Sequence, residues 1–161
     1  MSIDEYNKIV DLFSDKVYRF VLKNLRDVEK SQDIIQDSFE KLWRNVENVT
    51  YEKAKSYLFT TAYHTMIDML RREKKKGDFE NVKPSEYSHS EQYSDLKEIL
   101  DEAVQKLPDA QRSVLTLRDY EGYSYQEIAE ITGLNESQVK VYIYRARLFL
   151  KEYIGSLDTV I

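Results

Sequence analysis

The sequence has no cysteine, and only four glycines and two prolines among its 161 residues. The lack of cysteine excludes disulfide bonds, thiolate metal sites and thiol nucleophiles. Because glycine and proline interrupt helices, a chain with so few of them can form long helices. The sequence also lacks an apolar run long enough to cross a membrane, and its N-terminus lacks the basic start and apolar stretch of a signal peptide. We therefore expect a mostly helical, soluble and cytoplasmic protein.

The balance of charge argues at first against a nucleic-acid partner. The formal net charge is -5, whereas affinity for phosphate comes from lysine and arginine. The basic residues are concentrated in two places, however: five lie between Tyr63 and Lys76, and four lie between Ser137 and Lys151, where there is no acid. We expect such a protein to bind DNA poorly alone and well when a partner holds it there.

Apolar residues recur every three or four positions along most of the chain, which is the period of an amphipathic helix. The stretch 77–94 lacks this period, is polar and anionic, and contains Gly77 and Pro84. We therefore predict an all-α protein with two small helical domains, at residues 1–76 and 95–161, joined by a flexible polar linker at 77–94. The helices are predicted at approximately 6–21, 31–46, 53–75, 95–107, 109–120, 124–132 and 135–150.

Polar residues at the starts of two of these helices predict where they begin. Ser31 is the predicted N-cap of the second helix, and Asp109 caps a later helix that Gly122 closes. Phe39 and Trp43 lie on the apolar stripe of the second helix, so we predict that both are core residues.

Residues 124–147 have the pattern of a helix-turn-helix. Ser124 and Glu127 form a capping box that opens a short helix, and Gly133 supplies the left-handed residue that a tight stop needs. Asn135 and Gln138 then open a second helix, whose apolar arc faces the core. That arc consists of Val139, Ile143, Ala146 and Leu150.

The opposite arc of this second helix is predicted to bind DNA. It combines hydrogen-bonding, cationic and apolar groups, which contact base edges and phosphates in the major groove. A packed helical hairpin with a solvated basic face is the simpler alternative. The predicted DNA-binding residues are Ser137, Lys140, Val141, Tyr144, Arg145 and Arg147, with Leu148 beside them.

The third predicted helix is apolar or aromatic on nearly all sides around Tyr57 to Met69. This is more apolar surface than a helix with one solvated face requires. We expect something other than the core of its own domain to use the surplus.

Three motifs, in this order, resemble the extracytoplasmic-function (ECF, group IV) sigma factors of the sigma-70 family. Residues 31–43 resemble region 2.2, residues 55–72 resemble regions 2.3 and 2.4, and residues 107–147 resemble region 4. The resemblance implies a bacterial transcription initiation factor, not an enzyme, that directs core RNA polymerase to promoters by recognising their -10 and -35 elements. It implies no cofactor and no metal site.

The resemblance also implies roles for particular residues. The second helix would dock on the β′ clamp helices of the polymerase through Asp33, Ile34, Gln36, Asp37 and Glu40. The third helix would open the -10 element and hold the exposed strand by stacking and phosphate contacts. Its candidate residues are Tyr57, Phe59, Tyr63, His64, Arg71, Arg72 and Lys74. In region 4, the base-facing residues for the -35 element would be Lys140, Val141, Tyr144 and Arg145.

The sequence departs from the family at a few of these positions. An asparagine is common in the family where His64 stands, and arginines are common where Thr60 and Tyr63 stand. Tyr142 occupies a place that is often basic. These departures leave open which base is captured near His64.

The implied partners are core RNA polymerase, through its β′ clamp helices and β flap, and promoter DNA. An anti-sigma factor, which is membrane-anchored in many cases, is a further implied partner, whereas the chain itself would not insert into a membrane. Two other hypotheses remain open. A stand-alone helix-turn-helix regulator would bind DNA tightly as a dimer. A metal-dependent nuclease would use the carboxylates of Asp33, Asp37 and Glu40, although His64 and His89 have no ligand spacing.

Overall fold

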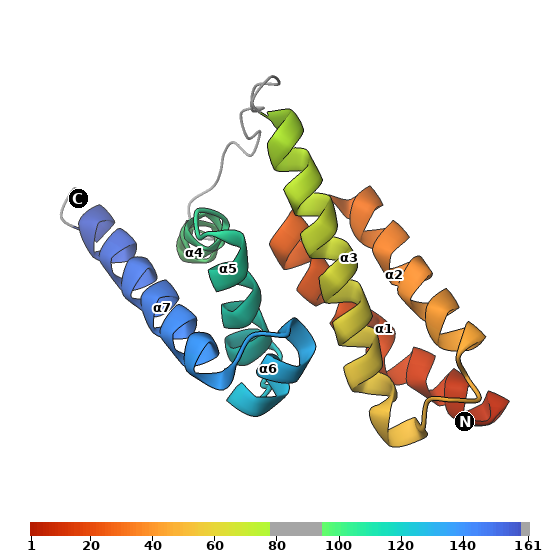
Figure 1. Ribbon diagram of the computed structural model, residues 1–161. Coiled ribbons are helices and arrows are strands. Elements are labelled where there is room, and N and C mark those ends of the chain that lie inside the picture. The colour runs from red at the N-terminus through yellow and green to blue at the C-terminus, as the bar shows by residue number, and fades with distance from the viewer. Residues whose placement is uncertain (78–94, 159–161) are drawn as a thin grey trace.

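A computed structural model describes residues 1–77 and 95–158 of the chain (Figure 1). Within these residues the backbone forms helices and turns and no strand, so the predicted all-α fold is confirmed. A 3₁₀ turn, η1 (Tyr51–Lys53), precedes α3, and a π-helical turn, η2 (Thr116–Tyr120), follows α5. The helices are α1 (Ile3–Leu25), α2 (Val28–Arg44), α3 (Ala54–Gly77), α4 (Asp95–Gln105), α5 (Asp109–Leu115), α6 (Tyr125–Thr132) and α7 (Glu136–Asp158).

The predicted linker lies, from residue 78 to residue 94, outside the described residues. The proposed domain boundaries therefore stay a prediction. None of the described helices combines the length and the apolar character that crossing a membrane requires.

Helices α1, α2 and α3 pack on one another as the N-terminal domain (Figure 1). The side chain of Ser2 caps α1 and Glu5 completes the capping box, while Arg26 ends the helix in the left-handed conformation, with φ 55°. The cap of α2 is Asp27, whose side chain accepts a hydrogen bond from Lys30 N at 2.9 Å. The prediction that Ser31 caps this helix is therefore wrong, because Ser31 lies buried inside its first turns.

Two aromatic residues of α2 differ in their burial. Phe39 is half-buried and packs against the core, as predicted. Trp43 is 46% exposed and packs edge-on against Tyr6, with ring centroids 5.0 Å apart. The prediction that Trp43 is a core residue is wrong, because this ring lies in the last turn of α2, which ends at Arg44, and nearly half of its surface faces solvent.

Helices α4 to α7 form the C-terminal domain, and its caps follow the sequence closely. Ser124 and Glu127 form the predicted capping box of α6, and Gly133 ends that helix with φ 81°. Gly122 also has a positive φ, and its amide bonds to the carbonyl of Arg118 as the preceding turn closes. One cap is displaced: Pro108, rather than Asp109, precedes α5.

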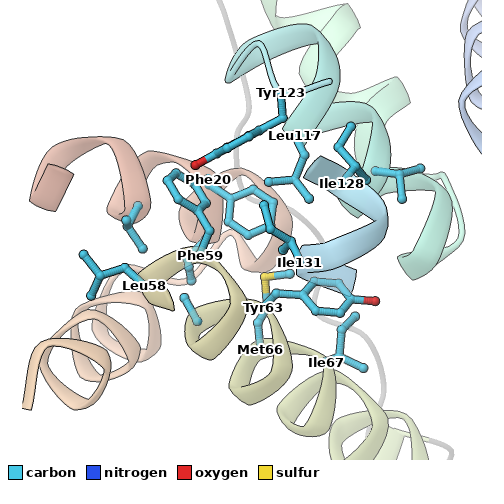
Figure 2. Packing of buried hydrophobic residues seen from close by; sticks show 14 of the residues in the cluster. Phe20, Leu58, Phe59, Tyr63, Met66, Ile67, Leu117, Tyr123, Ile128 and Ile131 are labelled. Carbon is cyan, nitrogen blue, oxygen red and sulfur yellow. The ribbon is translucent and has the colours of Figure 1, made fainter. Parts of the chain in front are cut away.

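The two domains share one apolar core. A single cluster of buried residues runs from Phe20 and Phe59 in the N-terminal domain to Leu117, Ile128 and Ile131 in the C-terminal domain (Figure 2). Helix α6 packs against α3, and η2 packs against α1. Each domain alone would bury only a modest core, and here each covers the apolar surface of the other.

Candidate nucleic-acid interfaces

The predicted DNA-binding arc of α7 lies on the surface. We call it the α7 face and define it by Ser137, Lys140, Val141, Tyr144, Arg145 and Arg147, all of which are exposed. On the opposite side of the helix Val139, Ile143 and Ala146 are buried, as the periodicity predicts. Tyr144 projects furthest, with 66% of its surface exposed. The helix backbone therefore needs no rearrangement to present this arc to a duplex.

The start of α7 is fixed by reciprocal hydrogen bonds. Gln138 N donates to Asn135 Oδ1 at 2.8 Å, and Asn135 N donates to Gln138 Oε1 at 3.0 Å. These bonds satisfy amides that the first turn of a helix leaves unpaired. The residues that would enter a major groove thus belong to a well-capped helix end.

The three cations of the α7 face differ in whether an acidic side chain is paired with them. Arg147 donates two hydrogen bonds to the carboxylate of Asp119, at 2.5 and 3.2 Å, and this contact raises the pKa of its guanidinium. Lys140 lies 4.0 Å from Glu136. Arg145 makes no ion pair with any residue that the structure describes. Of the three, Arg145 is the most available for a bidentate base contact.

The candidate -10 residues on α3 are divided between surface and interior. We call them the α3 face and define it by Tyr57, Phe59, Tyr63, His64, Arg71, Arg72 and Lys74. His64 and the three basic residues are exposed. Phe59 and Tyr63, by contrast, are only 1% and 7% exposed. In the described arrangement these two rings have no surface on which a base can stack.

The C-terminal domain is what covers these two rings. Phe59 lies between Phe20 and Tyr123, with ring centroids 5.7 and 5.1 Å away, and meets Tyr123 edge-on (Figure 2). Ile131 of α6 points toward Tyr63 in the same view. Burial raises the pKa of the Tyr63 hydroxyl, and Asp109 and Tyr142 add to this effect while Arg71 opposes it. The surplus apolar surface of α3 is thus used by the other domain.

Tyr57 is held differently from the other aromatic residues of the α3 face. It is half-buried, and its hydroxyl accepts a hydrogen bond from Asn45 Nδ2 at 3.0 Å and lies 3.4 Å from Lys41 O. These contacts tie α3 to the end of α2. The side chain therefore serves the packing of the N-terminal domain.

The predicted docking residues of α2 form an acidic surface, with one exception. Asp33, Gln36 and Glu40 are exposed and Asp37 is half-exposed. Ile34 is 1% exposed and belongs to the core, so its placement on this surface is wrong. Ile34 belongs to the buried stripe of α2, with Ser38 and Leu42 at four-residue steps after it, so it faces the core although acids flank it in the sequence.

The carboxylates of this surface are spread out and partly neutralised. Asp37 pairs with Lys41 at 3.1 Å and Glu40 with Arg44 at 3.8 Å, each one turn apart on α2. Among residues 1–77 and 95–158, no three histidine or acidic side chains are gathered as they would be around a metal ion.

Two residues at the domain boundary were not singled out in the sequence. Asn24 is 1% exposed and donates a hydrogen bond to Thr116 Oγ1 at 2.9 Å, across the boundary. Tyr123 is also buried, and burial raises the pKa of its hydroxyl. A signal for Asn24 was present: it follows Phe20 by four residues and so lies on the apolar stripe of α1. A polar side chain on such a stripe indicates a polar partner elsewhere.

Two family models match the chain. The model of sigma-70 region 2 matches residues 9–76, and that of sigma-70 region 4 matches residues 97–150. The chain is 30% identical over 160 residues to the ECF RNA polymerase sigma factor SigM of Bacillus subtilis, covering 94% of each chain. It is 34% identical over 144 residues to the RNA polymerase sigma factor SigV of the same organism, covering 88% of this chain and 86% of the relative.

Solved structures share the fold. The sigma factor RpoE of Bartonella quintana, crystallised with the anti-sigma factor NepR, aligns with a TM-score of 0.78 and 24% identity, over 95% of this chain and 98% of that chain. CnrH, in complex with the cytosolic domain of CnrY, aligns with a TM-score of 0.71 and 20% identity, over 94% of this chain and 88% of that chain. Both likenesses extend over the N-terminal and C-terminal domains.

Proposed function

Because this chain belongs to the ECF sigma factors of the sigma-70 family, we propose that it binds core RNA polymerase and directs it to specific promoters. It is a transcription initiation factor, and its work is binding rather than catalysis. The observation that carries this function is the ordered pair of region 2 and region 4 on one chain, the second with an exposed arc on a well-capped helix. Its place of action is the bacterial cytoplasm, where polymerase works.

The α7 face recognises the -35 element of the promoter. Lys140, Val141, Tyr144 and Arg145 contact base edges, and Ser137 and Arg147 contact the flanking backbone. The exposure of this arc supports the assignment, since an α-helix in the major groove reads bases through its outward residues. Arg147 must first exchange Asp119 for a phosphate.

The α3 face opens the -10 element and holds one separated strand. Arg71, Arg72 and Lys74 neutralise phosphates, and Phe59 and Tyr63 supply flat surfaces on which bases stack once the rings are uncovered. His64 is already exposed and forms an edge-on contact with the Tyr63 ring, with centroids 5.1 Å apart. It is the side chain best placed to contact a base at the border of the covered region.

The acidic surface of α2 docks on the β′ clamp helices of the polymerase, and the C-terminal domain contacts the β flap. Asp33, Gln36, Asp37 and Glu40 supply charge and hydrogen-bond acceptors, and the neighbouring Trp43 supplies an exposed aromatic side chain. An anti-sigma factor, membrane-anchored or free, regulates the chain by binding both domains.

Transcription with purified core polymerase tests this function. The template is a pool of promoter fragments from the source genome, and the expected result is a set of transcripts that start at fixed positions only when the protein is added. The matched control is the double variant Tyr144→Ala, Arg145→Ala, which alters two exposed side chains and is expected to keep the fold and to lose these transcripts.

Failure of the wild-type protein to produce any promoter-specific transcript would sink the proposal. Tight binding to a duplex site without polymerase would favour the stand-alone regulator instead. Metal-dependent cleavage of the template that disappears in Asp37→Ala would favour the nuclease.

A further inference from the structure

Three large, mostly apolar side chains are exposed on α7. Val141 is 43% exposed, Tyr144 66% and Leu148 42%. They follow one another at steps of three and four residues, so they lie on one side of the helix, and we call them the apolar stripe. A group of this kind indicates a surface that another molecule covers, because the burial of apolar surface is favourable.

The charges around the apolar stripe favour duplex DNA as that molecule. At about 100° per residue, Arg145 lies on one side of the stripe, and Lys140 and Arg147 lie on the other. All three cations are exposed, and no acid occurs from Ser137 to Lys151. A major groove has phosphates along both of its edges and base edges between them. Cations on both sides of an apolar centre match this arrangement.

Val141 occupies the centre of the α7 face. Ser137 lies one turn before it and Arg145 one turn after it, on the same side of the helix. A valine side chain is branched at Cβ and has one strongly preferred rotamer in a helix, so its two methyl groups point in a fixed direction. It has no atom that can donate or accept a hydrogen bond. Whatever faces Val141 in a complex must therefore be satisfied by apolar contact alone.

The major groove offers such a side chain one matching group. The base pairs display hydrogen-bond donors and acceptors there, and the C5 methyl group of thymine is the apolar exception. A donor or acceptor pressed against Val141 would lose its water and gain no partner, which is costly. A thymine methyl group in the same place would exchange water for an apolar contact, which is favourable.

We propose that Val141 is a specificity-determining residue that reads the C5 methyl group of a thymine in the -35 element, next to the base that Arg145 reads. Tyr144 and Leu148 lie beside this contact and exclude water from it. The inference rests on the proposed role of the α7 face in -35 recognition, and it adds the identity of one base. Arg145 selects by hydrogen bonds, whereas Val141 selects by their absence.

Replacement of thymine by uracil tests the methyl contact, because uracil lacks only the C5 methyl group and pairs with adenine as thymine does. The template is a promoter that the transcription assay identifies, and each thymine of its -35 element, on either strand, is replaced in turn. Competition binding of the polymerase holoenzyme compares each replaced promoter with the original. At the thymine opposite Val141, uracil is expected to weaken binding about fourfold, which is the effect of one buried methyl group.

Variants at Val141 assign the effect to this side chain. Val141→Ser removes both methyl groups and is expected to bind the thymine and uracil promoters equally. Val141→Ile keeps an apolar, β-branched side chain and is expected to keep the preference for thymine. Leu12→Ser is the matched control, since it removes an exposed apolar side chain from α1 and should leave the preference at the wild-type value. Circular dichroism of every variant verifies that the helices are intact.

Two results would overturn the inference while leaving the proposed function intact. One is equal affinity of the wild type for thymine and uracil at every position of the -35 element. The other is a preference that Val141→Ser retains in full. The methyl effect then comes from another residue or from the shape of the DNA, and the apolar stripe is left to a protein partner. Absence of any promoter-specific transcript is a separate result, which rejects the proposed function and this inference with it.

Discussion

The two faces proposed to bind DNA are built from similar side chains but lie in opposite environments. Each face combines at least one tyrosine with arginine and lysine. The α7 face is exposed along its length, whereas the aromatic centre of the α3 face is buried beneath the other domain. The difference follows from the amount of apolar surface. The outer arc of α7 is mostly polar, but α3 is apolar on nearly all sides. A large apolar patch of that kind is typically buried against another surface.

The comparison shows what an aromatic residue on a DNA-binding helix does when no DNA is present. Tyr144 is 66% exposed, so its ring would give up little protein contact when it meets a duplex. Phe59, in the role proposed for it, would exchange one aromatic partner, Tyr123, for a base. The same residue class thus contributes to folding at one face and only to binding at the other.

The largest expected difference between the faces is in stability. Phe59→Ala removes a ring packed against Phe20 and Tyr123 and is expected to lower the free energy of unfolding by about 3–5 kcal/mol. Tyr144→Ala removes an exposed ring and is expected to change it by no more than about 0.5 kcal/mol. Urea denaturation followed by circular dichroism measures both. Similar losses for the two variants would contradict the assigned environments.

The local structure of the C-terminal domain could be predicted from the sequence because its signals are short-range. The capping boxes at Ser124 and Asn135 and the left-handed Gly133 each depend on side chains within four residues of one another. The exposed arc of α7 followed from its buried arc. The same reasoning correctly assigned α3 more apolar surface than its own domain needs.

The features that could not be predicted from the sequence depend on contacts between segments that are distant along the chain. No periodicity in α3 could show that Tyr123, some 60 residues later, packs on Phe59. The exposure of Trp43 and the burial of Ile34 follow from where α2 ends relative to α1 and from its rotation about its own axis. A pattern of apolar residues indicates which arc is covered, and the identity of the cover is a property of the whole fold.

The next prediction concerns base recognition at the exposed face. Arg145 has no ion pair among the described residues, so its fork is free to bind a base edge. Arg145→Ala is expected to reduce discrimination between a correct and a mutated -35 sequence by about 1–3 kcal/mol. Competition binding of the polymerase holoenzyme to the two promoters measures this difference.

Lys151→Ala is the matched control, because it removes one exposed cation from the same helix beyond the α7 face. It is expected to weaken binding to both promoters alike and to leave discrimination intact, as the loss of a phosphate contact does. If Arg145→Ala behaved like this control, Arg145 would be assigned to the backbone rather than to a base.

A third prediction tests the left-handed turn at Gly133, which precedes α7. Gly133 has φ 81° and nothing lies within 4 Å of an added Cβ, so the cost of Gly133→Ala is the backbone strain alone, about 1–2 kcal/mol. Gly155 lies within α7, and nothing lies within 4 Å of its added Cβ either. Gly155→Ala is expected to stabilise the protein, by up to about 1 kcal/mol. Thermal unfolding of the two variants should therefore show shifts of opposite sign, and a shift of the same sign would refute the left-handed turn.

The smallest expected effect decides whether Arg147 belongs with Arg145 as a DNA contact or with Asp119 as part of the fold. The pair lies on the surface, so Asp119→Asn is expected to cost less than about 1 kcal/mol of stability. Because the change frees the guanidinium and removes an anion near the face, affinity for the -35 duplex should rise by roughly twofold. Glu152→Gln removes an acid from the far end of α7 and serves as the control. If both variants change the affinity equally, only the net charge matters, and Arg147 is then a structural residue that orients η2 against α7.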